Sequence, residues 1–206
     1  MPRQAGRRNK DFAQKRQELI RSLTEFALAA DLRRPSLREF ALGVGVTEPT
    51  LRHYFTDRQG TVLAILEEMS RRGQSIWEAV ATASPDGRQA LEQYFLMSRM
   101  GMRHGGFVRT HAFGLIEGLA DKDVGRAYVH LILEPSLQSL MSKLRLSAGK
   151  PLAEPELRAL ALAVFSPLLL MSLHQDLLGG RDIAPLDGDD LTRALTAFLS
   201  HPINDN

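Results

Sequence analysis

The apolar residues of this 206-residue chain recur at helical spacing along nearly its whole length. Leu19, Leu23 and Phe26 lie on one stripe with steps of four and three residues, as on one face of an amphipathic helix. No stretch alternates apolar and polar residues over the length of a strand, so a sheet is not expected. The sequence therefore predicts an all-α protein of about nine helices. Beyond the first 58 residues, helical segments are expected at residues 59–83, 88–103, 106–120, 122–145, 156–178 and 189–200.

Several classes of protein are excluded by what the chain lacks. It contains no cysteine, which removes disulfide frameworks, thiolate metal sites and cysteine nucleophiles and suits a reducing cytoplasm. The charged N-terminus is not followed by the apolar segment of a secretory signal. The longest chargeless apolar run lies between Arg158 and His174 and spans 15 residues. Because a bilayer needs roughly 18–20 residues, we expect a buried helix there, no membrane segment and a cytoplasmic protein.

No arrangement of residues indicates enzymatic chemistry. Phosphate-cradling glycine loops, nucleophile elbows and His-Glu-x-x-His motifs do not occur in the sequence. His104 and His111 are seven residues apart, but Gly105 and Gly106 interrupt the helix and no carboxylate lies four residues away. We therefore expect no metal site, no cofactor and no enzymatic activity.

Residues 31–60 carry the clearest local signals, because each short helix there begins with its own cap. Ser36 and Glu39 fit a capping box, in which each side chain accepts a hydrogen bond from the other residue's backbone amide. Thr56 and Gln59 repeat this spacing, and Thr47 can cap a helix between the two boxes. Three closely spaced helix starts are therefore predicted.

The first two of these helices are joined by a glycine turn and form a helix-turn-helix at residues 36–55. Gly43 and Gly45 lie at the turn, where a tight bend often requires a positive φ. In such a motif the second helix lies in the DNA major groove. With Leu51 and Phe55 buried, its outward face carries Glu48, Pro49, Thr50, Arg52, His53 and Tyr54. Two other classes fit a helix-turn-helix: an interaction module that contacts protein, and a helical enzyme fused to the motif.

The run Phe40-Ala41-Leu42-Gly43-Val44-Gly45-Val46-Thr47-Glu48-Pro49-Thr50-Leu51-Arg52-His53-Tyr54-Phe55, followed by a long amphipathic helix, resembles the DNA-binding domain of the TetR family of bacterial transcriptional regulators. The resemblance covers residues 15–75. It implies a basic arm at residues 1–14, the DNA-binding domain at 15–75 and a helical ligand-binding and dimerisation domain at 76–206. It also implies a homodimer, most often a repressor, that leaves a near-palindromic operator on double-stranded DNA when an unknown small-molecule effector binds.

The resemblance also implies which residues contact DNA. The family usually has a tyrosine where this chain has Arg52 and a lysine where it has Arg58, and both are phosphate contacts. Arginine suits phosphate, but it is also the commonest reader of guanine, so both roles stay open for Arg52. Ser36 is expected at a phosphate, with a cap alone as the alternative. The full expected set is Ser36, Arg38, Glu48, Pro49, Thr50, Arg52, His53, Tyr54 and Arg58.

The net charge of +2 hides an asymmetry along the chain. Residues 1–58 carry 12 Lys or Arg against 7 Asp or Glu, a net of +5, and the remainder carries 14 against 17, a net of −3. A basic head on an acidic body is typical of a protein that meets a polyanion through one end. Arg3, Arg7 and Arg8 are candidates to follow the DNA backbone or enter the minor groove, with a solubilising tail as the alternative.

Two residue sets in the C-terminal region are candidates for sensing and pairing. The candidate ligand pocket consists of Trp77, Phe95, Met100, Phe107, His111, Phe113 and Glu117, although Met and Phe at helical spacing also suit a plain core. The candidate dimer interface consists of Leu160, Val164, Leu168, Met171, Ala194, Ala197 and Phe198. Some of these must instead pack within the chain. Two-fold pairing would present two recognition helices to the operator.

Overall fold

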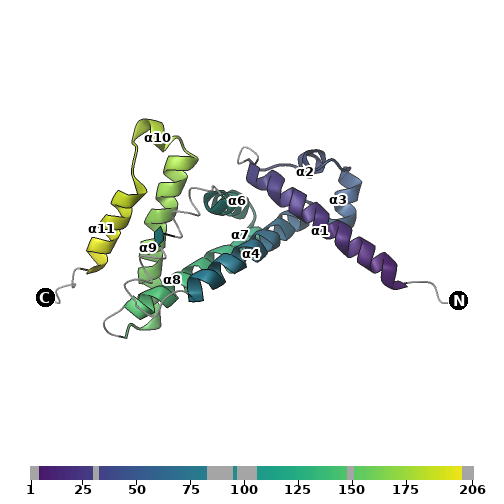
Figure 1. Cartoon of the computed structure of the whole chain (residues 1–206). Helices are drawn as coiled ribbons and strands as arrows, with labels where there is room; N and C mark the ends of the chain where they lie inside the picture. The colour runs from purple at the N-terminus through teal and green to yellow at the C-terminus, as the bar shows by residue number, and fades with distance from the viewer. Residues whose placement is uncertain (1–4, 30–32, 83–94, 97–105, 148–150, 201–206) are drawn as a thin grey trace. The chain divides into compact units, whose positions relative to one another are not determined.

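The computed structural model describes residues 5–29, 33–82, 95–96, 106–147 and 151–200. Within these ranges every regular element is a helix and no strand occurs, which confirms the all-α prediction. The chain divides into two compact units (Figure 1). The head unit comprises the described residues of Met1–Ser75 and Arg109–Leu133, and the body unit those of Ile76–Val108 and Glu134–Asn206.

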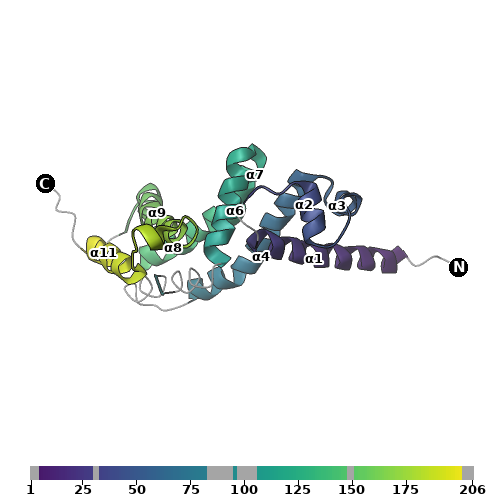
Figure 2. The same cartoon turned by 90° about the horizontal axis from the view of Figure 1, so that it is seen from above.

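The head unit begins with four helices, α1 (Ala5–Ala29), α2 (Leu37–Gly43), α3 (Glu48–Phe55) and α4 (Arg58–Thr82). The apolar stripes predicted from spacing form its core, where Leu23, Phe40, Leu51 and Leu66 are fully buried. Phe40 packs edge-on against Phe26, with ring centroids 5.9 Å apart. The first turns of α1 extend past α3 in both views (Figures 1 and 2).

The turn between α2 and α3 needs glycine at two positions for different reasons. Gly45 has a φ of +69°, which side chains rarely adopt. Gly43 is required by space, because a Cβ there would lie 2.3 Å from Cε2 of Phe26. The turn closes with a hydrogen bond of 2.9 Å from the Val46 amide to the Ala41 carbonyl.

The start of α4 differs from the predicted capping box at Thr56. Asp57 is the capping residue, because its Oδ1 accepts the Gly60 amide at 2.7 Å. Thr56 has a φ of 72° and its amide closes the last turn of α3 on the Arg52 carbonyl at 2.9 Å. A residue that ends one helix in this way cannot begin the next, so the cap lies one residue later than predicted.

The segment expected as one helix at 122–145 has three parts. These are α7 (Lys122–Tyr128), a π-helix η1 (Val129–Leu133) and α8 (Glu134–Ser147), preceded by α6 (Gly106–Ala120) at its predicted bounds. Residues 109–133 pack in the head unit although they lie within the range 76–206 expected for the C-terminal domain. α6 and α7 approach closely, since a Cβ on Gly118 would lie 2.8 Å from the Gly125 Cα.

The body unit is built around α8 and α9 (Glu154–Asp176), with α10 (Gly180–Ile183) and α11 (Gly188–Ser200) following. Phe95, Leu140, Leu157 and Phe165 are each at most 2% exposed. α9 is long and apolar enough to span a membrane by length and composition, and 39% of that window is buried. The buried helix expected here therefore has one face in the core and another exposed.

Candidate nucleic-acid interface

The N-terminus of α2 has the predicted capping box. The Ser36 amide donates to Glu39 Oε2 at 2.7 Å, and the Glu39 amide donates to Ser36 Oγ at 3.2 Å. The backbone and hydroxyl hydrogen bonds from Ser36, together with nearby Arg33, hold the pKa of Glu39 below its usual range. Ser36 is exposed and Arg38 lies exposed two residues later. The contact of both residues with phosphate stays a prediction.

The helix α3 is anchored through one face and exposed through the other. Thr47 caps it as predicted, accepting the Thr50 amide at 3.3 Å. Leu51 is fully buried and Phe55 is 4% exposed, so both hold the helix in the head core. The outward set is divided by exposure: Pro49, Arg52 and His53 are exposed, and Glu48, Thr50 and Tyr54 are half-buried.

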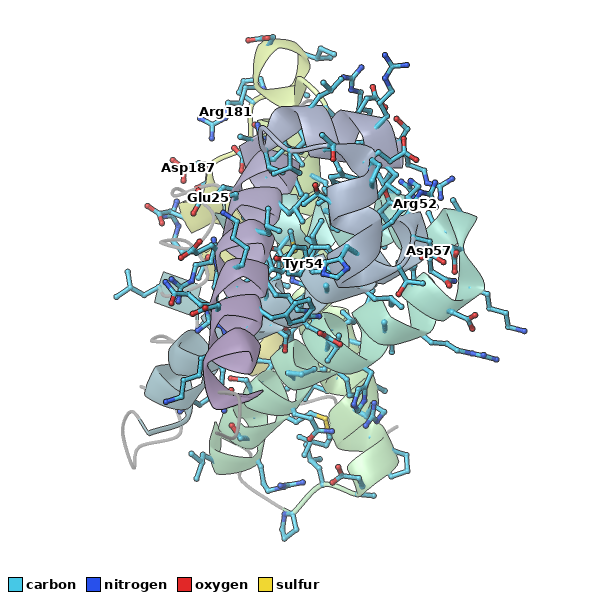
Figure 3. All side chains as sticks on the ribbon, turned by 90° about the vertical axis from the view of Figure 1, so that its right-hand side faces the viewer. Glu25, Arg52, Tyr54, Asp57, Arg181 and Asp187 are labelled. Carbon is cyan, nitrogen blue, oxygen red and sulfur yellow. The ribbon has the colours of Figure 1, made fainter. Side chains whose placement is uncertain are left out.

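Arg52 pairs with Glu48 along α3. Their N···O distance is 2.7 Å, and the side chains are 55% and 35% exposed. Exposed helical pairs at this spacing contribute only about 0.3–0.5 kcal/mol, so the pair orients Arg52 without locking it. Arg52 and Tyr54 project to different sides of α3, and Tyr54 lies between α3 and α1 (Figure 3).

An aromatic cluster joins α1 to α3. The Phe12 ring stacks on Tyr54 with centroids 4.8 Å apart and lies edge-on to His53 at 5.5 Å. Phe12 is 39% exposed, although it lies seven residues before Leu19 and so continues the buried stripe of α1. Arg16 lies over the Phe55 ring at 5.2 Å. Phe12 therefore positions His53 and Tyr54, two of the expected DNA-contacting residues. The sequence does not indicate this role, because nothing in its pattern links Phe12 to α3.

Arg58 and Glu117, expected respectively at a phosphate and in a ligand pocket, bind each other. Arg58 donates to the two Glu117 carboxylate oxygens at 2.6 and 3.0 Å, and Arg34 Nε donates at 3.3 Å. The Glu117 side chain is 0% exposed and that of Arg58 is 27% exposed. Breaking a buried pair costs about 3–5 kcal/mol, more than the roughly 1.5–3 kcal/mol of a charge-assisted hydrogen bond. The pair with Glu117 therefore opposes a phosphate contact by Arg58, and that contact stays a prediction.

The other expected pocket residues are divided between the two units, and their role in a ligand pocket stays a prediction. His111 is buried in the head unit, where its Nδ1 lies 2.8 Å from the Tyr128 hydroxyl and burial lowers its pKa to about 4. Phe113 belongs to the head core. In the body unit Phe95 is 2% exposed and Phe107 packs on Phe165 at 6.2 Å. Met100 and the side chain of Trp77 lie outside what the structure describes.

The body unit contains an open cleft of about 670 Å³ that the sequence did not indicate. Gln175 shapes it by donating to the Ala184 carbonyl at 3.0 Å and accepting the Leu186 amide at 3.2 Å. Because α9 and the loop before α11 both line the cleft, helical periodicity could not reveal it. Its lining comprises Met171, Ser172, Gln175, Asp176, Arg181, Pro185, Leu186, Asp187, Gly188 and Asp190.

The expected dimer interface needs a correction on α9. Val164 and Leu168 are each 2% exposed, so they pack within the chain and are not available to a partner. Leu160 and Met171 are half-buried, and Ala194 and Ala197 on α11 are exposed. The exposed face of α9 consists instead of Ala159, Leu162, Ala163, Ser166 and Leu170. The side chain of Phe198 lies outside the described set.

The backbone of Arg7 and Arg8 lies in the first turns of α1. Arg3 and the side chains of Arg7 and Arg8 lie outside what the structure describes, so their contact with DNA stays a prediction. Among the described residues no group of three or more His, Cys, Asp or Glu side chains could hold a metal ion.

The structure of the chain is similar to that of a known protein, although comparison of its sequence with family models and curated proteins gives no match. No family model matches the chain, and no curated protein matches it. A solved structure from Mesorhizobium loti MAFF303099, assigned to the TetR family of transcriptional regulators, matches it with a TM-score of 0.62 at 18% identity. The match covers 92% of this chain and 96% of that one. The resemblance noted in residues 15–75 is therefore accompanied by a similar fold across nearly the whole chain.

Proposed function

We propose that this chain, whose helices follow the fold of a TetR-family regulator, is a sequence-specific regulator that binds double-stranded DNA and is not an enzyme. The observation that carries the proposal is the geometry of α3. Leu51 and Phe55 fix the helix in the core while Arg52 and His53 project from its exposed face. A short, rigid helix with a polar outer face is what major-groove recognition requires.

On DNA, α3 lies in the major groove and the two capped N-termini face the phosphate backbone. Arg38 on α2 binds a phosphate, and Arg52 gives up its pair with Glu48 to read a base. The side chain of Phe12 supports Tyr54 and His53 from α1, so these groups meet DNA with little loss of side-chain freedom. Arg58 is not part of this set, because it stays with Glu117.

The functional form is a homodimer that pairs through the exposed face of α9. Leu162 and Leu170 are 49% and 65% exposed there, and the small side chains of Ala159, Ala163 and Ser166 allow a second helix to approach closely. Two-fold pairing makes this patch self-complementary. It also places two recognition helices on half-sites about 34–36 Å apart, so the operator is near-palindromic.

The regulator acts in the cytoplasm as a repressor whose operator affinity depends on a small-molecule effector. Such an effector can release DNA only by binding the released conformation more tightly than the bound one.

Selection of bound DNA from a random duplex pool tests the proposal. The wild type should enrich an inverted repeat, with an affinity that falls by orders of magnitude between low and moderate salt. Arg38→Gln should reduce the salt slope by about one phosphate contact. Arg145→Gln is the matched control, because Arg145 is an exposed arginine of the body unit paired with Glu154. Failure to enrich any sequence, with no salt-dependent affinity, would favour the protein-contacting module instead.

A further inference from the structure

Two consecutive residues at the start of α4 are held by the corner where α6 ends and α7 begins. Arg58 is bound by Glu117 on α6. Gln59 Nε2 donates to Asp121 at 3.0 Å, and Asp121 is the N-cap of α7, where the Val124 amide donates to it at 3.1 Å. Side chains roughly sixty positions apart in the sequence therefore tie this corner to the first turn of α4.

The same guanidinium also reaches the segment that enters α2. Arg58 Nε donates to the Pro35 carbonyl at 2.7 Å, so each of its three nitrogens has an acceptor. Pro35 is buried and directly precedes Ser36, the N-cap of α2. Any displacement of Arg58 would therefore disturb the residue that begins the helix-turn-helix.

We infer that Glu117 is a positioning residue for DNA binding, which acts through Arg58 to hold the N-termini of α2 and α4 in place. This inference rests on the proposed function, because the geometry it maintains is that of the DNA-binding helices. In the opposing account Arg58 leaves Glu117 and binds a phosphate. The buried Glu117 carboxylate would then lose its bidentate partner, and the Pro35 carbonyl would lose its hydrogen-bond donor. A single phosphate contact would have to compensate for both losses.

The first test is Glu117→Gln on the operator that the wild type selects, measured over a series of salt concentrations. Operator affinity should fall about tenfold, the effect of one displaced base contact. The salt slope should not change, because no phosphate contact is lost. Glu68→Gln is the matched control. Glu68 is also buried and bound by two arginines, Arg71 and Arg72, but its contact to another helix is with Gln17 on α1. It should leave operator affinity unchanged.

Arg58→Lys separates charge from geometry. Lysine keeps the positive charge but cannot serve three acceptors in a fixed fork. A positioning role predicts that this variant loses affinity as Glu117→Gln does, whereas a phosphate contact predicts near wild-type binding. Tighter binding or a steeper salt slope in Glu117→Gln would overturn the inference, as would wild-type affinity in Arg58→Lys.

Amide hydrogen exchange provides a readout that needs no DNA. The Phe40 amide bonds the Ser36 carbonyl at 3.0 Å and reports the first turn of α2. It should exchange about tenfold faster in Glu117→Gln than in Glu68→Gln, and equal rates would refute the positioning role.

If the wild type selects no DNA, the proposed function fails, and the exchange rates alone decide whether Glu117 positions the first turn of α2. Should Glu117→Gln not fold, the double variant Glu117→Gln/Arg58→Gln, which removes both charges, takes its place in both measurements.

Discussion

Replacing Arg52 with alanine should weaken binding to the preferred operator and relax the choice of base at one position in each half-site. Arg52 is exposed on the outer face of α3, where its guanidinium pairs with Glu48 at 2.7 Å. The Arg52 side chain is 55% exposed and long enough for its guanidinium to reach a base edge. Truncation removes that contact without disturbing the buried face of the helix.

The expected magnitude follows from two opposing terms. A bidentate arginine–guanine contact contributes about 1–3 kcal/mol of discrimination. Binding the base requires Arg52 to leave Glu48, which costs about 0.3–0.5 kcal/mol for an exposed pair at this spacing. The net loss for Arg52→Ala is therefore about 0.5–2.7 kcal/mol in each half-site, or roughly 2- to 100-fold in affinity.

Operators with every single-base change in one half-site provide the assay. Arg52→Ala should bind all four bases almost equally at one position and keep the wild-type preference elsewhere. Glu48→Gln is the companion variant, because it removes the ion pair and leaves Arg52 intact. It should retain the preference at that position. Uniform weakening on every sequence, with a salt slope smaller by about one contact, would assign Arg52 to phosphate and refute the base-reading account.

Three further outcomes are expected. Gly43→Ala should lower the free energy of unfolding by about 1–3 kcal/mol, because its Cβ would lie 2.3 Å from the Phe26 ring, and Phe26→Leu should partly restore stability in a denaturant titration. Arg71 and then Arg72 lower the pKa of Glu68 to about 2 from 4.5. The stability from this carboxylate, at most about 3 kcal/mol, is therefore present above pH 4.5 and lost as the pH falls toward 2, and Glu68→Gln should remove that pH dependence. Leu162→Glu should convert the dimer to a monomer in sedimentation experiments and lower operator affinity, whereas Leu119→Glu, a control at an 88% exposed leucine of the head unit, should remain dimeric.

Features set by neighbouring residues were predictable from the sequence. The caps at Ser36 and Thr47 depend on a hydroxyl and an amide three residues away, and both form as expected. The bounds of α6 follow from the glycines and apolar residues of that segment alone. The exception is the cap of α4, where the positive φ of Thr56 belongs to the end of the preceding helix. Local chemistry therefore predicts a helix start only where the adjacent helix does not use the same residue.

The exposed face of α9 could not be identified from the sequence for a different reason. This helix is apolar on nearly every side, so periodicity indicates a helix without indicating which face is buried. Val164 and Leu168 turn inward and Leu162 and Leu170 turn outward. Packing of α9 against α8, α10 and α11 distinguishes these leucine and valine positions. The folded chain buries one apolar face of α9 and leaves the other exposed, a difference that helical spacing does not contain.

Local sequence patterns do not show that residues 109–133 pack in the same unit as the helix-turn-helix. A boundary at residue 75 separates the helix-turn-helix from residues 109–133, although both belong to the head unit. The ion pair between Arg58 and Glu117 crosses that boundary, and its members are 59 positions apart in the sequence. Neither residue carries a signal for the other, because an arginine at a helix start and a glutamate on an apolar helix each have common alternative roles. Inside the head unit this pair joins α4 and α6, two helices that also have residues assigned to the body unit.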